Sequence, residues 1–208
     1  MKKNTITTNM YEFILLIIIV LCIIGVCIKG AYSADNTLII DQSGSGNNIS
    51  VIQDGLGHSA TVLMGATLAS DNNTISIEQR DYGIKTSTIQ IPNGINNGVS
   101  ILQAGTGNHT AAITNLNGSG NSIAIDQSGA GSHQFNVISS TGTTNNGNTI
   151  AGQQSGGSGA DKYFSLNLNG TAGSSVNVQQ TNPTQANTGS LSIQCSSGSC
   201  GSYSYIRN

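Results

Sequence analysis

The chain has 208 residues, of which only 8% are charged, 27 are glycine, two are proline and none is tryptophan, unlike an ordinary globular domain. The low charge and the few aromatic residues argue against nucleic-acid binding, which requires a basic surface. The low charge also removes the main electrostatic defence against self-association.

The N-terminal segment is typical of a secretory signal. Two lysines near the start precede an uninterrupted apolar run over 13–28, and the triplet Ala31-Tyr32-Ser33 fits the small-x-small rule for cleavage. The apolar run is short for a membrane span. We therefore expect residues 1–33 to be a cleaved signal peptide rather than a retained anchor, and residues 34–208 to be exported.

After residue 34 the chain repeats a seven-residue phrase in which apolar residues alternate with small or polar ones. Its copies are Asn47–Gln53, Asn73–Gln79, Asn97–Gln103, Asn121–Gln127, Asn148–Gln154 and Ser174–Gln180. Successive glutamines lie 26, 24, 24, 27 and 26 residues apart. A period of this size, with one supersecondary unit per period, indicates a solenoid.

No long helical period occurs after residue 34, and short alternating segments separated by Gly, Ser, Asn or Asp favour strands. We predict fourteen strands, at 36–42, 47–53, 58–64, 73–79, 85–91, 97–103, 108–114, 121–127, 132–138, 148–154, 162–168, 174–180, 189–195 and 200–206. The predicted fold is an all-β solenoid of about seven stacked two-stranded coils. Parallel strands about 4.8 Å apart would give a core about 34 Å long.

The repeated phrase places two β-branched columns and the flanking amides on the inward face. The columns begin at Ile49 and Val51, and Gly152 interrupts the second column, which predicts a weaker coil there. A buried amide without a partner costs about 1–3 kcal/mol, but identical stacked amides satisfy one another, as in cross-β structures. We therefore expect ladders made by Gln53, Gln79, Gln103, Gln127, Gln154 and Gln180, and by Asn47, Asn73, Asn97, Asn121 and Asn148.

Several connections have the form Gln-x-Gly-x-Gly, and they predict one side of tight turns. Glycine at alternating positions accepts the positive φ that such a reversal requires. The candidate turn glycines are Gly55, Gly57, Gly105, Gly107, Gly129 and Gly131. Connections on the other side, such as 65–72 and 139–147, are longer and irregular.

The phrase Asn-x5-Gln-x-Gly-x-Gly followed by Asn or His resembles the curlin repeat, and the match is best at 47–60 and 97–108. Curlins are subunits of curli, the extracellular amyloid fibres of bacteria. The resemblance implies export through an outer-membrane pore, nucleation by a second curlin subunit, and polymerisation into a surface fibre for biofilm and adhesion. The alternate strands mostly lack the second glutamine of the family, so three alternatives stay open: a major subunit, a minor, nucleating subunit, or a divergent relative.

Cys195 and Cys200 depart from the repeat. Aligning Leu191 and Ile193 with the inward apolar pair places Cys195 at the glutamine position and Cys200 at the asparagine position, across a tight turn. This placement predicts a disulfide, which the exported compartment permits, with two reduced thiols as the alternative. Zinc is disfavoured because a second pair of ligands is missing.

The remaining titratable residues predict no chemistry. His109 and His133 fall at outward positions of adjacent strands, which favours a solvated pair over a weak metal site. Glu78 and Asp126 share an outward row two coils apart, whereas an acid–base pair needs convergent groups in a pocket. We expect no enzyme activity, cofactor or metal.

Two alternatives to a self-assembling fibre subunit remain. A monomeric binding solenoid for glycan or ice needs a flat, regular outward column, usually of threonine, whereas the outward column here runs Ser50, Ser76, Ser100, Ala124, Ala151, Asn177. A β-helix enzyme acting on polysaccharide needs a groove with clustered acids and bases, which the repeat does not provide. The partner that the sequence favours is therefore a second copy of the chain.

Overall fold

The computed structural model describes residues 35–64, 70–114, 116–140, 143–195 and 200–208. The predicted signal peptide at 1–33 lies outside the described residues. Residues 35–208 form one compact unit. Within the described ranges the chain forms strands and turns and no helix, so no described helix is long and apolar enough to cross a membrane.

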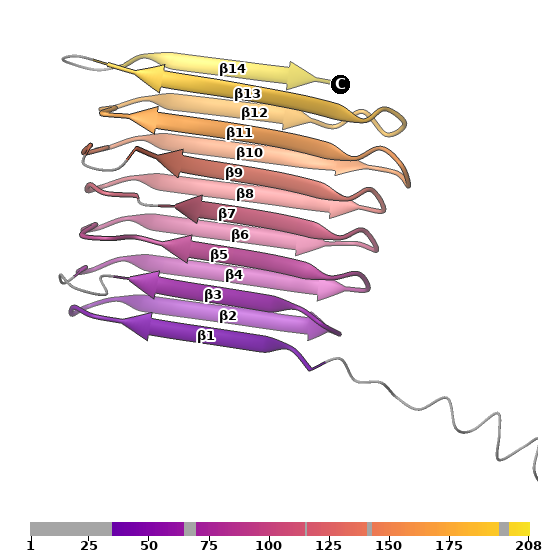
Figure 1. Ribbon diagram of the computed structural model, residues 1–208, viewed down its shortest axis with the longest axis horizontal. Helices are drawn as coiled ribbons and strands as arrows, with labels where there is room; N and C mark the ends of the chain where they lie inside the picture. Colours follow the sequence, from indigo (N-terminus) through magenta and orange to yellow (C-terminus); the bar gives the residue numbers. More distant parts are fainter. Residues whose placement is uncertain (1–34, 65–69, 115, 141–142, 196–199) are drawn as a thin grey trace, which may run out of the picture. The chain divides into compact units, whose positions relative to one another are not determined.

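Fourteen strands alternate between two sheets (Figure 1). Their bounds are Thr37–Gln42 (β1), Asn48–Gly55 (β2), Ser59–Met64 (β3), Thr74–Asp81 (β4), Lys85–Gln90 (β5), Gly98–Ala104 (β6), His109–Thr114 (β7), Ser122–Gly129 (β8), His133–Ser139 (β9), Thr149–Gly156 (β10), Lys162–Asn169 (β11), Ser175–Gln180 (β12), Asn187–Gln194 (β13) and Ser202–Arg207 (β14). The predicted number and order of strands are confirmed, with bounds that differ by at most two residues.

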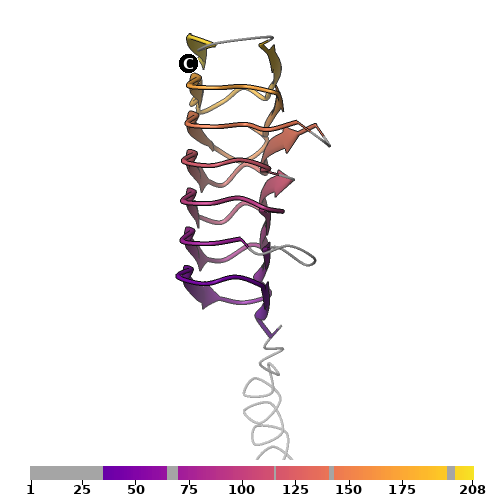
Figure 2. The same ribbon diagram turned by 90° about the vertical axis from the view of Figure 1, so that its left-hand side faces the viewer.

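The odd-numbered strands form one seven-stranded parallel sheet and the even-numbered strands form the other. The two sheets lie opposite one another and are joined by arches at both sides (Figure 2). In the even sheet each copy of the seven-residue phrase pairs in register with the next copy, so that Val99 pairs with Ile75 on one side and with Ile123 on the other. The predicted β-solenoid fold is therefore confirmed.

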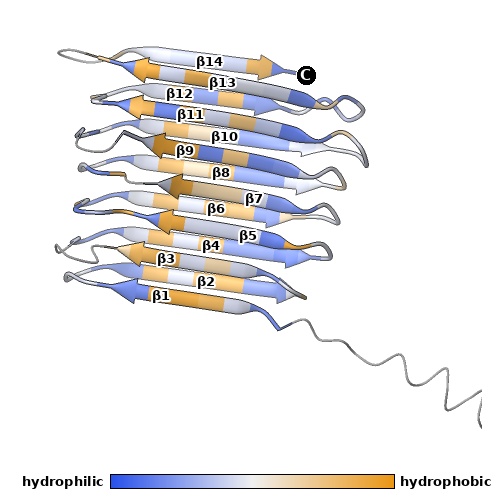
Figure 3. Cartoon of the chain, viewed as in Figure 1, coloured by the Kyte–Doolittle hydropathy of each residue, from blue (hydrophilic) through white to orange (hydrophobic). Residues whose placement is uncertain are grey.

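The core lies between the sheets, where each strand turns every second side chain inward. The two predicted apolar columns of the even sheet are buried from Ile75 and Ile77 onward, and the apolar bands repeat from coil to coil (Figure 3). Ile49 and Val51, in the first coil, are half-buried because no described strand covers their outer side.

The sequence predicts that Gly152 weakens its coil, but the structure gives this glycine a different role. A Cβ atom at this position would overlap the ring of Phe135, which reaches across from the odd sheet. Phe135 stacks on Phe164 at 5.5 Å between ring centroids, and Phe164 packs against Tyr205 at 5.0 Å. The glycine therefore makes room for an aromatic column, and the volume missing from one sheet is supplied by the other.

Candidate functional site

The inward glutamines form one continuous ladder through six coils. The Nε2 atom of Gln53 donates to Oε1 of Gln79 at 2.8 Å, and Gln79 donates in the same way to Gln103 at 3.0 Å. Gln103, Gln127 and Gln154 continue this pattern up to Gln180, with distances of 2.8, 2.8 and 2.7 Å. The ladder has a direction, since every amide donates toward the C-terminal coil.

Each ladder glutamine also ties the two sheets together. The second Nε2 hydrogen of Gln103 reaches the carbonyl oxygen of Thr86 at 3.2 Å, and that of Gln127 reaches Thr110 at 3.0 Å. Both of these acceptors belong to the odd sheet. Gln79 to Gln180 are fully buried, so the hydrogen bonds replace hydration that these amides have lost.

The asparagines form a second ladder that runs in the opposite direction. Oδ1 of Asn73 accepts from both the backbone N–H and the side-chain Nδ2 of Asn97, at 3.0 and 3.1 Å. Asn121 and Asn148 each donate the same two hydrogen bonds to the asparagine of the coil before. The ladder begins with Asn73 donating to Asn47, and in the sixth coil only the backbone N–H of Ser174 continues it.

The tight arches depend on glycine for two different reasons. Gly105 has a φ of +92°, and Gly55, Gly57 and Gly129 also have positive φ, as the turn pattern predicts. Gly107 and Gly131 do not, so the prediction of positive φ is wrong for them. A Cβ at Gly107 would overlap the carbonyl group of Gly131 in the next arch, so close stacking of the backbones requires glycine there.

Beneath the arches lies a buried column that the sequence does not predict. It consists of His58, Lys85, His109, His133 and Lys162. Each of these side chains lies within hydrogen-bond distance of backbone carbonyl oxygens near the arches. Nε2 of His109 lies 2.8 Å from the carbonyl oxygen of Ala104, and Nε2 of His133 lies 3.0 Å from that of Ser128. The column places a polar group on the inner side of the first five of these arches.

His109 and His133 are therefore not the solvated outward pair that the sequence predicts. Both are buried, and their rings stack at 4.9 Å between centroids. The predicted strand register is wrong by one residue in β7 and β9, and a slip of one residue moves every side chain to the other face. Apolar burial decides the register: Phe135 and Val137 face inward, while Gln134 is exposed.

Lys85 lies in a cage of carbonyl groups. Its Nζ donates to the carbonyl oxygens of Tyr82 at 2.8 Å, Gly83 at 3.3 Å, Gly105 at 2.7 Å and Gly107 at 2.6 Å. Burial lowers the pKa of this ammonium group, and the nearby Asp81 carboxylate raises it in part. Lys162 is buried in the same column, and its Nζ donates to Asn182 at 2.8 Å and to Gln185. Each lysine thus ties its arch to the loop of an adjacent coil.

The histidine stack predicts that acid destabilises the solenoid. Burial lowers the pKa of His109 from 6.5 to about 4, the hydrogen bond to Ala104 raises it in part, and His133 and Lys85 lower it further. Burial also lowers the pKa of His133. Between pH 6.5 and about pH 4 the histidines bind more protons in the unfolded chain than in the folded one. The free energy of unfolding therefore falls as the pH drops over this interval.

This pH dependence is measurable as the guanidinium midpoint of freshly prepared soluble chain at pH 6.5 and pH 4.5. The double variant His109→Gln/His133→Gln keeps an N–H donor in each arch and is expected to lose less stability over this interval than the unchanged chain. The comparison of the two proteins removes the contributions that they share. Equal losses for the two proteins would contradict the assignment of the acid sensitivity to this stack.

Cys195 and Cys200 form a disulfide, with their Cα atoms 5.9 Å apart. The predicted pair is therefore in contact, but its predicted surroundings are wrong. The cysteines join β13 to β14, on the side of the longer connections, and Cys195 follows Ile193 in the odd sheet rather than occupying a glutamine position. The bond closes a short loop, so its stabilising effect is expected to be local.

Intact-mass spectrometry checks the disulfide. A chain of residues 34–208, purified under non-reducing conditions, is expected to be two hydrogens lighter than the reduced chain and to resist alkylation. The variant Cys195→Ser/Cys200→Ser provides the reference, because reduction does not change its mass. Two alkylatable thiols in this freshly purified chain would rule the bond out.

The two outward carboxylates that the sequence analysis singles out do not lie side by side. Glu78 and Asp126 lie in one outward row, separated by Leu102 on β6. Burial raises the pKa of Asp126. No cluster of three or more His, Cys, Asp or Glu suited to a metal ion occurs in the described ranges.

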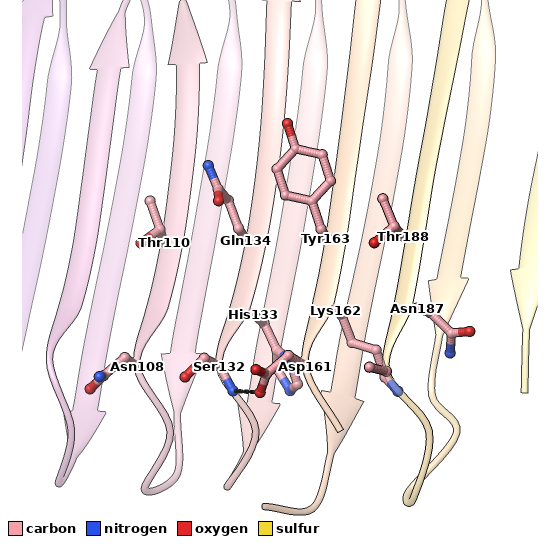
Figure 4. Close-up of a pocket in the computed structure, with 11 residues that line it drawn as sticks. Asn108, Thr110, Ser132, His133, Gln134, Asp161, Lys162, Tyr163, Asn187 and Thr188 are labelled. Atoms are coloured by element: carbon pink, nitrogen blue, oxygen red, sulfur yellow. Dashed lines mark hydrogen bonds between the residues drawn. The ribbon is translucent and has the colours of Figure 1, made fainter. Parts of the chain in front are cut away.

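A shallow groove crosses the outer face of the odd sheet (Figure 4). Thr110, Gln134, Tyr163 and Thr188 form one row across it, on neighbouring strands. At its edge the backbone N–H of Ser132 donates to Oδ1 of Asp161 at 2.7 Å. The row mixes hydroxyl, amide and aromatic groups, so it lacks the regular threonine column of a flat binding surface.

The two ends of the solenoid differ from its middle. Strands β1 and β2 are the first in their sheets and β13 and β14 the last, and no described strand pairs with their outer sides. Every residue of β1 is exposed, including Leu38, Ile39 and Ile40. Unpaired edges of this kind present backbone donors and acceptors to another chain.

Comparison with known proteins supplies one match. The curlin associated repeat matches residues 34–62, which contain β1, β2 and most of β3. No curated protein and no solved structure matches the chain. The match shows that this segment is similar to a curlin repeat, and the strands that it contains belong to the stacked parallel sheets.

Proposed function

We propose that this chain is a structural, self-assembling subunit of an extracellular curli-like amyloid fibre that contributes to biofilm matrix and surface adhesion. One observation carries the proposal: two buried amide ladders run through the solenoid and lead to unpaired strand edges. A further copy of the chain would continue both sheets and cover the apolar edge residues.

The energetics favour growth at these edges. Leu38, Ile39 and Ile40 are each about half exposed on β1, and burying such side chains contributes about 25 cal/mol per Å² of apolar surface. Proteins that avoid edge pairing place charges, prolines or covering elements on their edge strands. β1 has only Asp41 and β14 only Arg207 as charged residues, and neither strand contains proline.

The same features support a non-enzymatic role. Among the described residues, the inward side chains include the apolar core, the two amide ladders and the column that hydrogen bonds to arch carbonyls. A monomeric glycan- or ice-binding module has less support, because the outward row at Ser76, Ser100 and Ala124 is small and irregular. Export as a signal-bearing precursor, passage through an outer-membrane pore and nucleation by another curlin subunit belong to the proposal through the curlin match.

Polymerisation of the mature chain tests the proposal. Purified residues 34–208 are expected to form sedimentable fibrils that bind amyloid dyes after a lag, and sonicated fibrils are expected to remove the lag. The variant Ile39→Lys/Ile52→Lys charges two exposed edge positions and should slow elongation strongly, whereas Ser76→Lys/Ser100→Lys, on the outward face of central strands, should not. A mature chain that stays monomeric even with seeds would overturn the proposal.

A further inference from the structure

The direction of the glutamine ladder makes its two ends chemically different. Gln53 uses its Nε2 atom toward Gln79 and the carbonyl of Thr37, which leaves Oε1 as the ladder atom at the N-terminal end. In each ladder glutamine from Gln79 to Gln180, Oε1 accepts from the glutamine of the coil before it. The first coil therefore presents a hydrogen-bond acceptor.

The last coil presents a donor. Arg207 is the register partner of Gln180 on β14, so a guanidinium group stands where a seventh glutamine would be. Arginine has five N–H donors and no acceptor. Arg207 is exposed, and β14 is the last strand of its sheet.

We propose that copies of this chain join head to tail, with the last coil of one copy on the first coil of the next and Arg207 donating to Oε1 of the next copy's Gln53. This inference rests on the proposed fibre function and adds its polarity and register. β14 would pair with β2 of the next copy, with Ser202 on Asn48 and Arg207 on Gln53. β13 would pair with β1, with Thr188 on Thr37.

The apolar side chains independently support this register. Ile206 and Ile52 are each 52% exposed, the largest apolar residues on the outward faces of their edge strands. The proposed pairing places them side by side in one outward row. On the other sheet it places Leu38 over Gly189 and Ile40 over Leu191, which continues the columns of Phe164 and Leu166.

The charged side chains also differ between the two ends, with acidic residues at the acceptor end and a basic residue at the donor end. The first coil, residues 35–57, contains Asp35, Asp41 and Asp54 and no basic residue. The last coil, residues 187–208, contains Arg207 as its single charged side chain. Opposite ends attract, and a hydrogen bond from a guanidinium group is stronger than one between neutral groups.

Contacts between equal ends lack this complementarity. Two first coils would face Oε1 against Oε1 and aspartates against aspartates, and two last coils would oppose their guanidinium groups. An interface between different surfaces that does not close into a ring produces an open filament. Head-to-tail joining therefore yields a polar fibre whose subunits continue one solenoid.

Cysteine cross-linking in mixed fibres tests this interface. Chains carrying Ile52→Cys are mixed with isotope-labelled chains carrying Ile206→Cys, polymerised together and oxidised mildly. Neighbouring in-register strands bring Cα atoms within the separation that a disulfide spans. The expected product is the heterodimer between the two variants, identified by mass, while fibres of either variant alone give little dimer. The control Leu102→Cys, in the same outward row but inside the sheet, should not cross-link.

Each result decides the proposal. Homodimers of the Ile52→Cys chain or of the Ile206→Cys chain, fibres without cross-links, or equal cross-linking of the Leu102→Cys control would overturn the head-to-tail register. Fibre formation by the unchanged chain is scored separately, so failure of the fibre function and failure of this interface are distinguishable.

A charge swap provides a second readout. Gln53→Arg alone places a second guanidinium group opposite Arg207. Arg207→Glu alone places a carboxylate, which is an acceptor, opposite the acceptor Oε1 of Gln53. Each single variant is expected to slow seeded elongation at least tenfold. The double variant Gln53→Arg/Arg207→Glu is expected to recover most of the rate, because its ends are again complementary. Absence of recovery, with the monomer still folded by circular dichroism, would contradict the pairing of Arg207 with Gln53.

Discussion

Replacing Gln103 and Gln127 by leucine is expected to slow polymerisation and to destabilise the solenoid by about 2–6 kcal/mol, at about 1–3 kcal/mol for each orphaned group. The change keeps side-chain volume but removes the centre of the ladder. Gln154 Oε1 then loses its donor, and the hydroxyl of Ser87 loses its acceptor at Gln103. Such a loss is a large fraction of the stability of a typical domain.

Seeded elongation rates and the guanidinium midpoint of the fibrils measure both effects. The matched control is Gln134→Leu/Gln153→Leu, which replaces two exposed glutamines on the outer faces of β9 and β10. The control should retain the kinetics and the midpoint of the unchanged chain. Equal behaviour of the central and the outward pair would refute a structural role for the ladder.

The ladder itself is predictable from sequence because a single phrase recurs at a nearly constant period. An amide that recurs at the same place in every coil has the same surroundings in each, so stacking follows from the period. The alternating apolar residues Val99 and Ile101 fix which face is inward. The strands, the two sheets and both amide ladders therefore follow from the alternation within each phrase and from the period of its repetition.

The buried column beneath the arches is not predictable in this way. His109 and Lys85 occupy equivalent positions in successive coils, but they follow connections of different sequence. The register of β7 depends on how many residues the arch uses, and this number is set by contacts between stacked arches. The apolar residues Phe135 and Val137 carry the missed signal, since they assign β9 to the other face.

A graded series of glycine-to-alanine substitutions is expected to separate the two roles of glycine in the arches. Gly98→Ala adds a methyl group in open space at an ordinary φ and is expected to be neutral or to stabilise by up to about 1 kcal/mol. Gly147→Ala also meets open space, but its φ of +61° should cost about 1–2 kcal/mol.

Gly107→Ala is expected to have the largest effect of the three, about 3 kcal/mol or more, at the upper end of costs for overpacking. The φ of Gly107 lies outside the left-handed region, so alanine can adopt it. The new Cβ would, however, overlap the carbonyl of Gly131. The two arches are also joined by the hydrogen bond from Gly107 N to Gly129 O at 3.0 Å. Denaturant midpoints of the three soluble variants check the order. A Gly147→Ala loss exceeding that of Gly107→Ala would show that backbone conformation, not arch stacking, dominates.

Mass per length of the fibre, measured by scanning transmission electron microscopy, tests most directly whether the solenoid is the repeating unit of the fibre. Seven stacked strands at about 4.8 Å predict one chain per about 34 Å of a single protofilament. An amyloid in which each chain contributes one layer would instead contain one chain per about 4.8 Å. The first value would support end-to-end stacking of intact solenoids, and the second would contradict it.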